Sequence, residues 1–142
     1  MKSENLPITA SPVAQAQRFD FLPTYFGPAL ARRGEMLSYG WLRRLCSGYT
    51  GGHWNFYTLS NGGFYMAPDL SGKLEMVVAG NQFWGELSAD AAGIVAIFFT
   101  LGQMAAECEG KDAGDALTRH YQSLLDFVAD HPEAALFRSA IN

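Results

Sequence analysis

The chain of 142 residues is 49% hydrophobic and carries a formal net charge of −4, which is enough apolar material for one domain that folds without a disulfide or a metal. Its two cysteines lie far apart and neither belongs to a CxxC pair, so the pattern indicates reduced thiols and excludes a zinc or redox motif. Residues 1–74 hold seven basic and four acidic side chains (net +3), and residues 75–142 hold three and ten (net −7), an asymmetry that solvated helix faces also produce.

The N-terminal sequence MKSENLPITASPV lacks the basic region and apolar run of a secretion signal. Its prolines and small polar residues predict a flexible arm over residues 1–10, followed by a single domain over residues 11–142. The most apolar segment, residues 93–104, is shorter than the roughly 20 residues that cross a bilayer. We therefore expect a cytoplasmic protein that does not contact a membrane.

Two helices are predicted before residue 50. Ser11 is a good N-cap residue and Pro12 suits the first helical position, so a short helix is expected to begin there and to end before the Gly-Pro pair at 27–28. From residue 29, Leu37, Trp41 and Leu45 recur at i, i+4 and i+8, which predicts an amphipathic helix with these side chains inward. Leu30, Leu42 and Cys46 widen this apolar stripe. Its four arginines are then left toward water: Arg32, Arg33, Arg43 and Arg44.

The segment TGGHWNFYTLSNGGFYMAP, residues 50–68, gives the strongest local signal in the chain. A two-residue Asn61-Gly62 loop supplies the positive φ angles of a type I′ turn, so the segment predicts a β-hairpin. The cross-strand pairs that follow from such a turn are Leu59 with Phe64 and Tyr57 with Met66.

The rest of the chain completes an α+β pattern. Alternation over residues 73–79 predicts a third strand, and a short fourth strand is expected near Phe83. Ser88 is a candidate N-cap for a long helix, apolar nearly all round, that reaches about Glu107. One amphipathic helix and a final short helix near His131 follow. The predicted fold class is α+β: a small antiparallel meander of three to four strands packed with four to five helices in one compact domain.

Both faces of the predicted hairpin carry aromatic rings. Because alternate side chains of a strand point to opposite faces, Trp54 and Phe56 share one side and Tyr57 lies on the other. One face can belong to the core. The other is either covered by the N-terminal helices or partly exposed as a contact patch. The candidate partner-binding residues are Trp54, Tyr57, Asn61, Phe64 and Tyr65.

The sequence gives little support for catalysis. Cys46 and His53 could pair as nucleophile and base, with Glu35 or Asn55 orienting the base. However, no strained elbow or oxyanion loop flanks Cys46, which lies on the apolar side of its helix, so a buried structural thiol is the better interpretation. The other histidines have no ligand-type residue at i+4, and no glycine segment matches a phosphate loop. No catalytic residue, metal or cofactor is predicted.

Nucleic-acid binding is the alternative function. The aromatic hairpin could stack bases and the Arg-rich helix could contact phosphates, although no basic residue interleaves the rings and the net charge is negative. Mimicry of DNA is disfavoured, since duplex DNA carries about one charge per 1.7 Å and ten acids over residues 75–142 are too sparse to imitate it.

Five segments in order along the chain resemble the ArdB/KlcA antirestriction family: FLPTYFG (21–27), RGEMLSYGWLRRLC (33–46), GGHWNFYTLSNGGFYMAP (51–68), GNQFWGELSADAAGIV (80–95) and HPEAALFR (131–138). The resemblance implies a cytoplasmic protein of plasmids, mobile elements or genomic islands that relieves type I restriction while largely sparing methylation. It also implies a compact α+β fold and a non-enzymatic inhibitor that is distinct from the acidic DNA mimics. The implied partner is the type I restriction enzyme or an associated host protein, without strong DNA binding, and the family supplies no catalytic residues.

Overall fold

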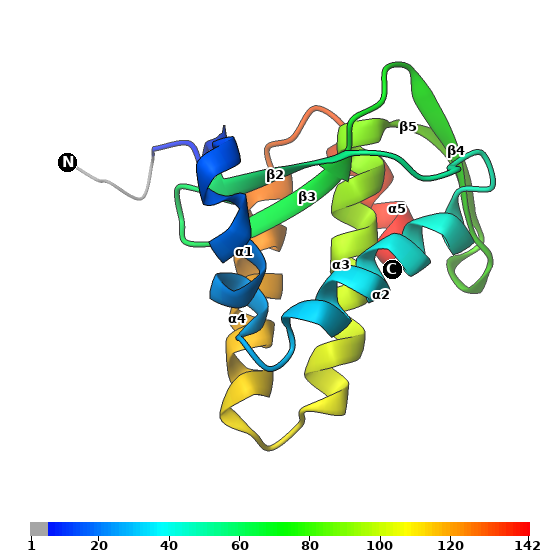
Figure 1. Ribbon diagram of the computed structural model, residues 1–142. Coiled ribbons are helices and arrows are strands. Elements are labelled where there is room, and N and C mark those ends of the chain that lie inside the picture. The colour runs from blue at the N-terminus through cyan, green and yellow to red at the C-terminus, as the bar shows by residue number, and fades with distance from the viewer. Residues whose placement is uncertain (1–5) are drawn as a thin grey trace.

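A computed structural model describes residues 6–142. In chain order its elements are β1 (Ala10–Pro12), the 3-10 turn η2 (Gln15–Gln17), α1 (Arg18–Phe26), α2 (Ala31–Leu45), β2 (Trp54–Leu59), β3 (Phe64–Pro68), β4 (Lys73–Val78), the 3-10 turn η3 (Ala79–Asn81), β5 (Phe83–Ser88), α3 (Ala89–Glu107), α4 (Asp112–Val128) and α5 (Ala134–Ile141). Helices and two small antiparallel sheets pack together around α3 (Figure 1). This arrangement confirms the predicted α+β class.

The N-terminal segment forms an edge strand, so the helix predicted to begin at Ser11 is wrong. Ser11 and Pro12 lie in β1, which pairs antiparallel with β2. An edge strand tolerates the missing N–H of proline, and α1 begins only at Arg18. Residues 1–5 of the predicted arm lie outside the described residues, whereas Ala10 pairs with Leu59. The division into an arm over 1–10 and a domain over 11–142 stays a prediction, and β1 crosses its boundary.

The second helix forms as predicted, but its inward face is rotated. Leu42 and Leu45 are buried, whereas Leu37 and Trp41 are only partly buried. Gly34 and Ser38 lie on the same buried side of the helix as Leu42 and Leu45. The absence of a side chain at Gly34 lets α2 approach α1 closely, since a Cβ there would lie 2.5 Å from the Phe26 ring.

The hairpin between β2 and β3 is present, but its turn and register differ from the prediction. The Leu59 carbonyl accepts a bond from Gly62 N–H at 3.0 Å, and Leu59 N–H donates to the Gly63 carbonyl at 2.9 Å. The loop therefore has three residues, with Gly62 alone at positive φ (+91°), which is the type I turn with a following left-handed residue rather than type I′. As a result Thr58 pairs with Phe64, and Phe56 with Met66, one residue away from the expected partners.

Contacts outside the hairpin set this register. Ser60 N–H donates to the Thr9 carbonyl at 2.9 Å, which keeps Ser60 in the loop. Asn61 donates to the Ser123 carbonyl of α4 at 2.9 Å and accepts from Gly63 N–H at 3.1 Å. Because the side-chain period of a strand is two, the shift moves Phe64 and Met66 to the face that carries Trp54.

The strands do not form one meander. Strands β4 and β5 pair with each other as a separate hairpin, and β1, β2 and β3 form the other sheet. In Figure 1 the two sheets lie on opposite sides of α3. A helix that is apolar nearly all round needs cover on every side, and this division provides it.

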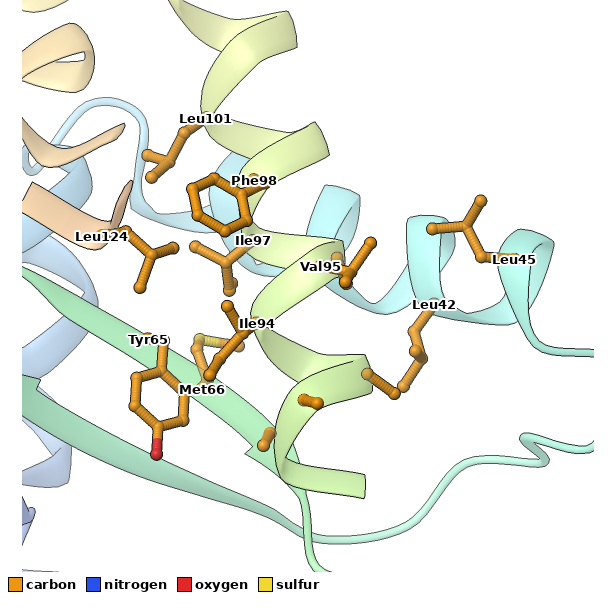
Figure 2. Close-up of a cluster of buried hydrophobic side chains, with 14 of the residues drawn as sticks. Leu42, Leu45, Tyr65, Met66, Ile94, Val95, Ile97, Phe98, Leu101 and Leu124 are labelled. Carbon is orange, nitrogen blue, oxygen red and sulfur yellow. The ribbon is translucent and has the colours of Figure 1, made fainter. Parts of the chain in front are cut away.

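Helix α3 is the centre of the core, and Ser88 caps it as predicted, its Oγ accepting from Ala91 N–H at 3.1 Å. Figure 2 shows Ile94 of α3 beside Met66 of β3, with Ile97 and Phe98 further along the same side of the helix, and Val95 on the side of α2. By length and hydropathy α3 could span a membrane, but most of its side chains are buried inside the protein. It is therefore the core helix that its composition predicts.

Candidate partner-binding surface

Phe64, expected to be an exposed ring near the turn, is a core residue. Its side chain is 0% exposed, because α1 covers this face of the hairpin. The rings of Phe21, Tyr25 and Phe26 lie 5.7, 4.6 and 5.2 Å from the Phe64 ring, measured between centroids. This face of β2 and β3 is therefore not available to a partner.

Trp54 is fixed in the same way and is 2% exposed. Its indole N–H donates to the Tyr49 hydroxyl at 2.7 Å, and its carbonyl accepts from the Arg18 guanidinium at 2.7 Å. The Tyr39 ring of α2 meets the indole edge to face at 5.0 Å. The one polar atom of the indole, Nε1, is therefore hydrogen-bonded. Because its ring and its carbonyl are both held in place, Trp54 positions the chain after α2.

Asn61 is exposed, but its side chain attaches the turn to α4 through the hydrogen bond to the Ser123 carbonyl.

The remaining candidates, Tyr57 and Tyr65, lie on the opposite face of the hairpin. The two rings stack at 4.6 Å, and Tyr65 also stacks against Phe127 of α4 at 5.8 Å. Tyr57 is half-buried, whereas Tyr65 is 3% exposed, so the expectation of an exposed Tyr65 ring is wrong.

A polar network begins at Tyr65, whose hydroxyl donates to Asp90 Oδ1 at 2.7 Å in the first turn of α3. Burial, followed by this hydrogen bond, raises the pKa of the Tyr65 hydroxyl far above its usual range. Burial also raises the pKa of Tyr57, which the charge of Asp90 reinforces. Both tyrosines are therefore neutral phenols near pH 7, and Tyr65 acts as a fixed donor.

The network continues to the segment before α5. His131 Nε2 lies 3.5 Å from Asp90 Oδ2, and Glu133 N–H donates to His131 Nδ1 at 3.0 Å. Since Nδ1 accepts, Nε2 carries the proton and faces the carboxylate. The Glu133 carboxylate accepts from Ser88 Oγ at 2.6 Å and from Ser88 N–H at 3.0 Å. These bonds join β5, the start of α3 and the chain before α5.

A groove of about 230 Å³ lies beside this network. Its walls are Asn55, Tyr57, Ala67, Pro68, Asp69, Leu70, Gly72, Ser88, Ala89 and Asp90. Two carboxylates, an amide and two hydroxyls line it, which suits hydrogen-bond donors or a cation. Of the residues predicted to bind a partner, only Tyr57 lines this groove. From the sequence, Ser88 and Asp90 are expected only at the start of a helix and His131 only near the start of the last helix, and Glu133 has no predicted role. All four lie in segments that carry the family resemblance.

The pair Cys46 and His53 does not form a catalytic site. Cys46 is buried, and burial raises its thiol pKa to about 11, whereas nucleophilic cysteines need a lowered pKa. His53 is exposed, and no hydrogen bond links it to Cys46 within residues 6–142. Over the same residues, no group of three or more His, Cys, Asp or Glu side chains is placed to hold a metal ion.

The features proposed for nucleic-acid binding are separated. Arg32, Arg43 and Arg44 are exposed on α2, and Arg33 donates two bonds to Glu107 of α3 at 2.8 and 2.6 Å. The hairpin rings that would stack on bases are buried, as Phe64 and Trp54 illustrate. The basic face of α2 therefore has no adjacent platform of hairpin rings.

The comparisons with known proteins agree on one family. A family model described as "Antirestriction protein" matches residues 47–142. The chain is 62% identical to an antirestriction protein KlcA of Escherichia coli, covering all of both chains, and 56% identical to a second KlcA of the same species, covering 96% of this chain and 94% of the other.

A solved structure matches as well, with a TM-score of 0.90 and 62% identity over 100% of each chain. It is described as that of the KlcA and ArdB proteins, with a novel fold and antirestriction activity against Type I DNA restriction systems in vivo but not in vitro. The match covers the whole chain, so it includes the elements that carry the hairpin, the Tyr65 network and the groove. The chain therefore belongs to the antirestriction protein family that includes KlcA and ArdB.

Proposed function

We propose that this protein relieves type I restriction in the cell while sparing methylation, and that it acts through contact with a protein. The observation that carries the proposal is the full-length 62% identity to a protein described as active against type I systems in vivo but not in vitro. Activity that is found only in cells favours a partner that the cell supplies. That partner is the type I enzyme in its cellular state or a host protein associated with it.

The placement of acidic side chains supports a mechanism other than DNA mimicry. Three carboxylates form hydrogen bonds within the protein: Glu107 with Arg33, Asp90 with Tyr65 and Glu133 with Ser88. The hydrogen bonds from Arg33 and Gln103 hold the pKa of Glu107 down at about 2. Carboxylates engaged in this way stabilise the fold and are not arrayed at phosphate spacing.

The proposal treats the protein as a non-enzymatic inhibitor in the cytoplasm, where type I enzymes meet entering DNA. The buried, high-pKa thiol of Cys46 supports a structural role for that residue. A weak alternative, binding of nucleic acid by the arginines of α2, would give an affinity that falls steeply with salt. Apolar contact with a protein would change little with salt.

Plating efficiency tests the proposal directly. Unmodified phage is plated on a host with an active type I system, with and without induction of this chain, and on the same host without the restriction system. We expect induction to raise plating only where the restriction system is active. Equal plating with and without induction in the restricting host would refute the proposed function.

A further inference from the structure

The outer face of the β4–β5 hairpin exposes two large apolar side chains. Trp84 is 72% exposed and Val77 is 48% exposed, and the two residues lie directly opposite each other in the ladder. The other face of the hairpin carries Leu74, Met76 and Leu87, which are buried in the core. The hairpin is therefore well packed on its inner face, and the apolar side chains Trp84 and Val77 are exposed only on its outer face.

Two glutamates lie next to this apolar pair. Glu75 and Glu86 are exposed and directly opposite each other in the same ladder, and like charges in that position destabilise a strand pair. The Trp84 indole N–H donates to Glu75 Oε2 at 2.6 Å, which holds one carboxylate beside the ring. Among the described residues neither glutamate forms an ion pair with a basic side chain, although Lys73 lies further along this face, opposite Ser88.

An apolar groove of about 450 Å³ adjoins this face at Val77. It is lined by Trp41, Arg44, Leu45, Val77, Val78, Ala79, Gly80, Asn81 and Phe99. The Trp41 and Phe99 rings stack at 4.9 Å, and the Arg44 guanidinium lies 4.8 Å from the Trp41 ring centre. These contacts fix the groove wall in the free protein, so an apolar side chain could enter without rearranging it.

We propose that the Trp84 face, defined as Glu75, Val77, Trp84, Glu86 and the adjoining groove, binds a short basic segment of a partner protein. An arginine or lysine of that segment lies between the two carboxylates and the Trp84 ring, through ion pairs and a cation–π contact. An apolar neighbour of that residue fills the groove. The proposal identifies the partner surface of the proposed function and rests on it.

Charge decides among the occupants of this face. A second copy of the chain would bring two further glutamates and a net charge of −4 to the same surface, and like charges across an interface are unfavourable. Phosphates of DNA would be repelled by the Glu75 and Glu86 carboxylates, and the basic side chain in the wall of the adjoining groove, Arg44, lies over the Trp41 ring. A basic protein segment relieves the repulsion between Glu75 and Glu86 and is the complementary partner.

Two assays with the same variants test the proposal. The variants are Trp84→Ser and the double variant Glu75→Gln/Glu86→Gln, and the control is Phe19→Ser, which removes a ring 89% exposed on α1. In the first assay each protein is titrated calorimetrically with a short peptide of alternating arginine and leucine, and with a glutamate-leucine peptide for comparison. In the second, the inducer concentration that gives half-maximal protection from type I restriction is measured.

We expect the wild type and Phe19→Ser to bind the arginine-leucine peptide and not the glutamate-leucine peptide. Both face variants should bind the arginine-leucine peptide with an affinity reduced on the order of tenfold or more, as is found when an anchor residue is removed. Protection should then need more inducer for the face variants, although Glu75→Gln/Glu86→Gln melts no lower than the wild type because a like-charge pair is removed. A merely structural role would not separate protection from melting in this way.

Three results would overturn the proposal. The first is arginine-leucine binding that is absent or is equal in all variants, and the second is full protection by well-folded face variants. The third is a wild-type dimer that Trp84→Ser dissociates, because a second copy would then be the occupant. If the wild type gives no protection, the proposed function fails, and the peptide titration still decides whether the face binds a basic segment.

Discussion

At the residue scale, single side chains show how position rather than type determines role. Tyr57 and Tyr65 face each other across the hairpin at 4.6 Å, yet Tyr65 is a buried donor to Asp90 and Tyr57 borders the groove. Cys46 and Cys108 differ in the same way, since Cys46 is fully buried and Cys108 is partly exposed.

The two thiols should therefore react at very different rates. Burial raises the Cys46 pKa to about 11, so its thiolate fraction at pH 8 falls roughly two orders of magnitude below that of an ordinary cysteine. We expect one thiol, Cys108, to react readily with a maleimide in the native protein, and both after unfolding, as mass spectrometry of labelled peptides would record. Comparable native labelling of Cys46 would argue against its burial.

The turn glycine gives a second prediction. Gly62 has φ +91°, where an L-residue costs about 1 kcal/mol or more. Gly62→Ala should lower the melting temperature by about 2–4 °C. Gly48→Ala, at a position without positive φ and with nothing near its Cβ, is the matched control and should melt close to the wild type. Equal melting of the two variants would contradict the three-residue turn.

At the element scale, α3 packs on the hairpin through one small residue. A Cβ on Gly93 would overlap the Cα and Cβ of Ala67 in β3 and the Met66 carbonyl. Gly102, two and a half turns further along the same helix, is exposed and has only the Tyr121 ring edge 3.7 Å from a Cβ. Gly93 is therefore required for close packing of α3 on β3, whereas Gly102 leaves room for a side chain.

Alanine substitution at Gly93 and at Gly102 should change the free energy of unfolding in opposite directions. Gly93→Ala forces α3 away from β3 and should destabilise the protein by about 2 kcal/mol or more. Gly102→Ala gains helix propensity of about 1 kcal/mol without a clash. Urea unfolding monitored by circular dichroism measures both, and the account requires opposite signs. A Gly93→Ala protein as stable as the wild type would show that α3 does not contact β3 at that residue.

The sequence predicted those elements whose signals are local. The cap at Ser88 and the apolar pattern to about Glu107 correctly predicted α3, Ala89–Glu107. The hairpin register could not be predicted, because it depends on bonds to Thr9 and Ser123, which lie far away in the chain. For the same reason alternation placed Phe64 next to a turn but could not reveal that α1 covers it. The Tyr65–Asp90–His131 network joins three segments that lie far apart in the chain, so no local sequence pattern predicts it.

At the scale of the whole molecule, the aromatic hairpin is mostly core, and the exposed surface lies elsewhere. Ser88 lines the groove beside Tyr57 and pairs with Lys73 at the end of the β4–β5 ladder, next to the Glu75–Glu86 pair of the Trp84 face. A partner could contact both without any change of the fold. The Trp84 face, rather than a charge field that imitates DNA, is the surface that we propose for inhibition.

The central claim is that the protein blocks cleavage through protein contact and leaves methylation intact. One measurement tests it most directly: phage that survives in a restricting host expressing this chain is replated on the same host without the chain, which reports whether the progeny were modified. The account predicts high survival in the first plating and nearly full plating in the second. A DNA mimic would block both activities, because both need bound DNA. Surviving progeny that are restricted on the second plating would contradict the account.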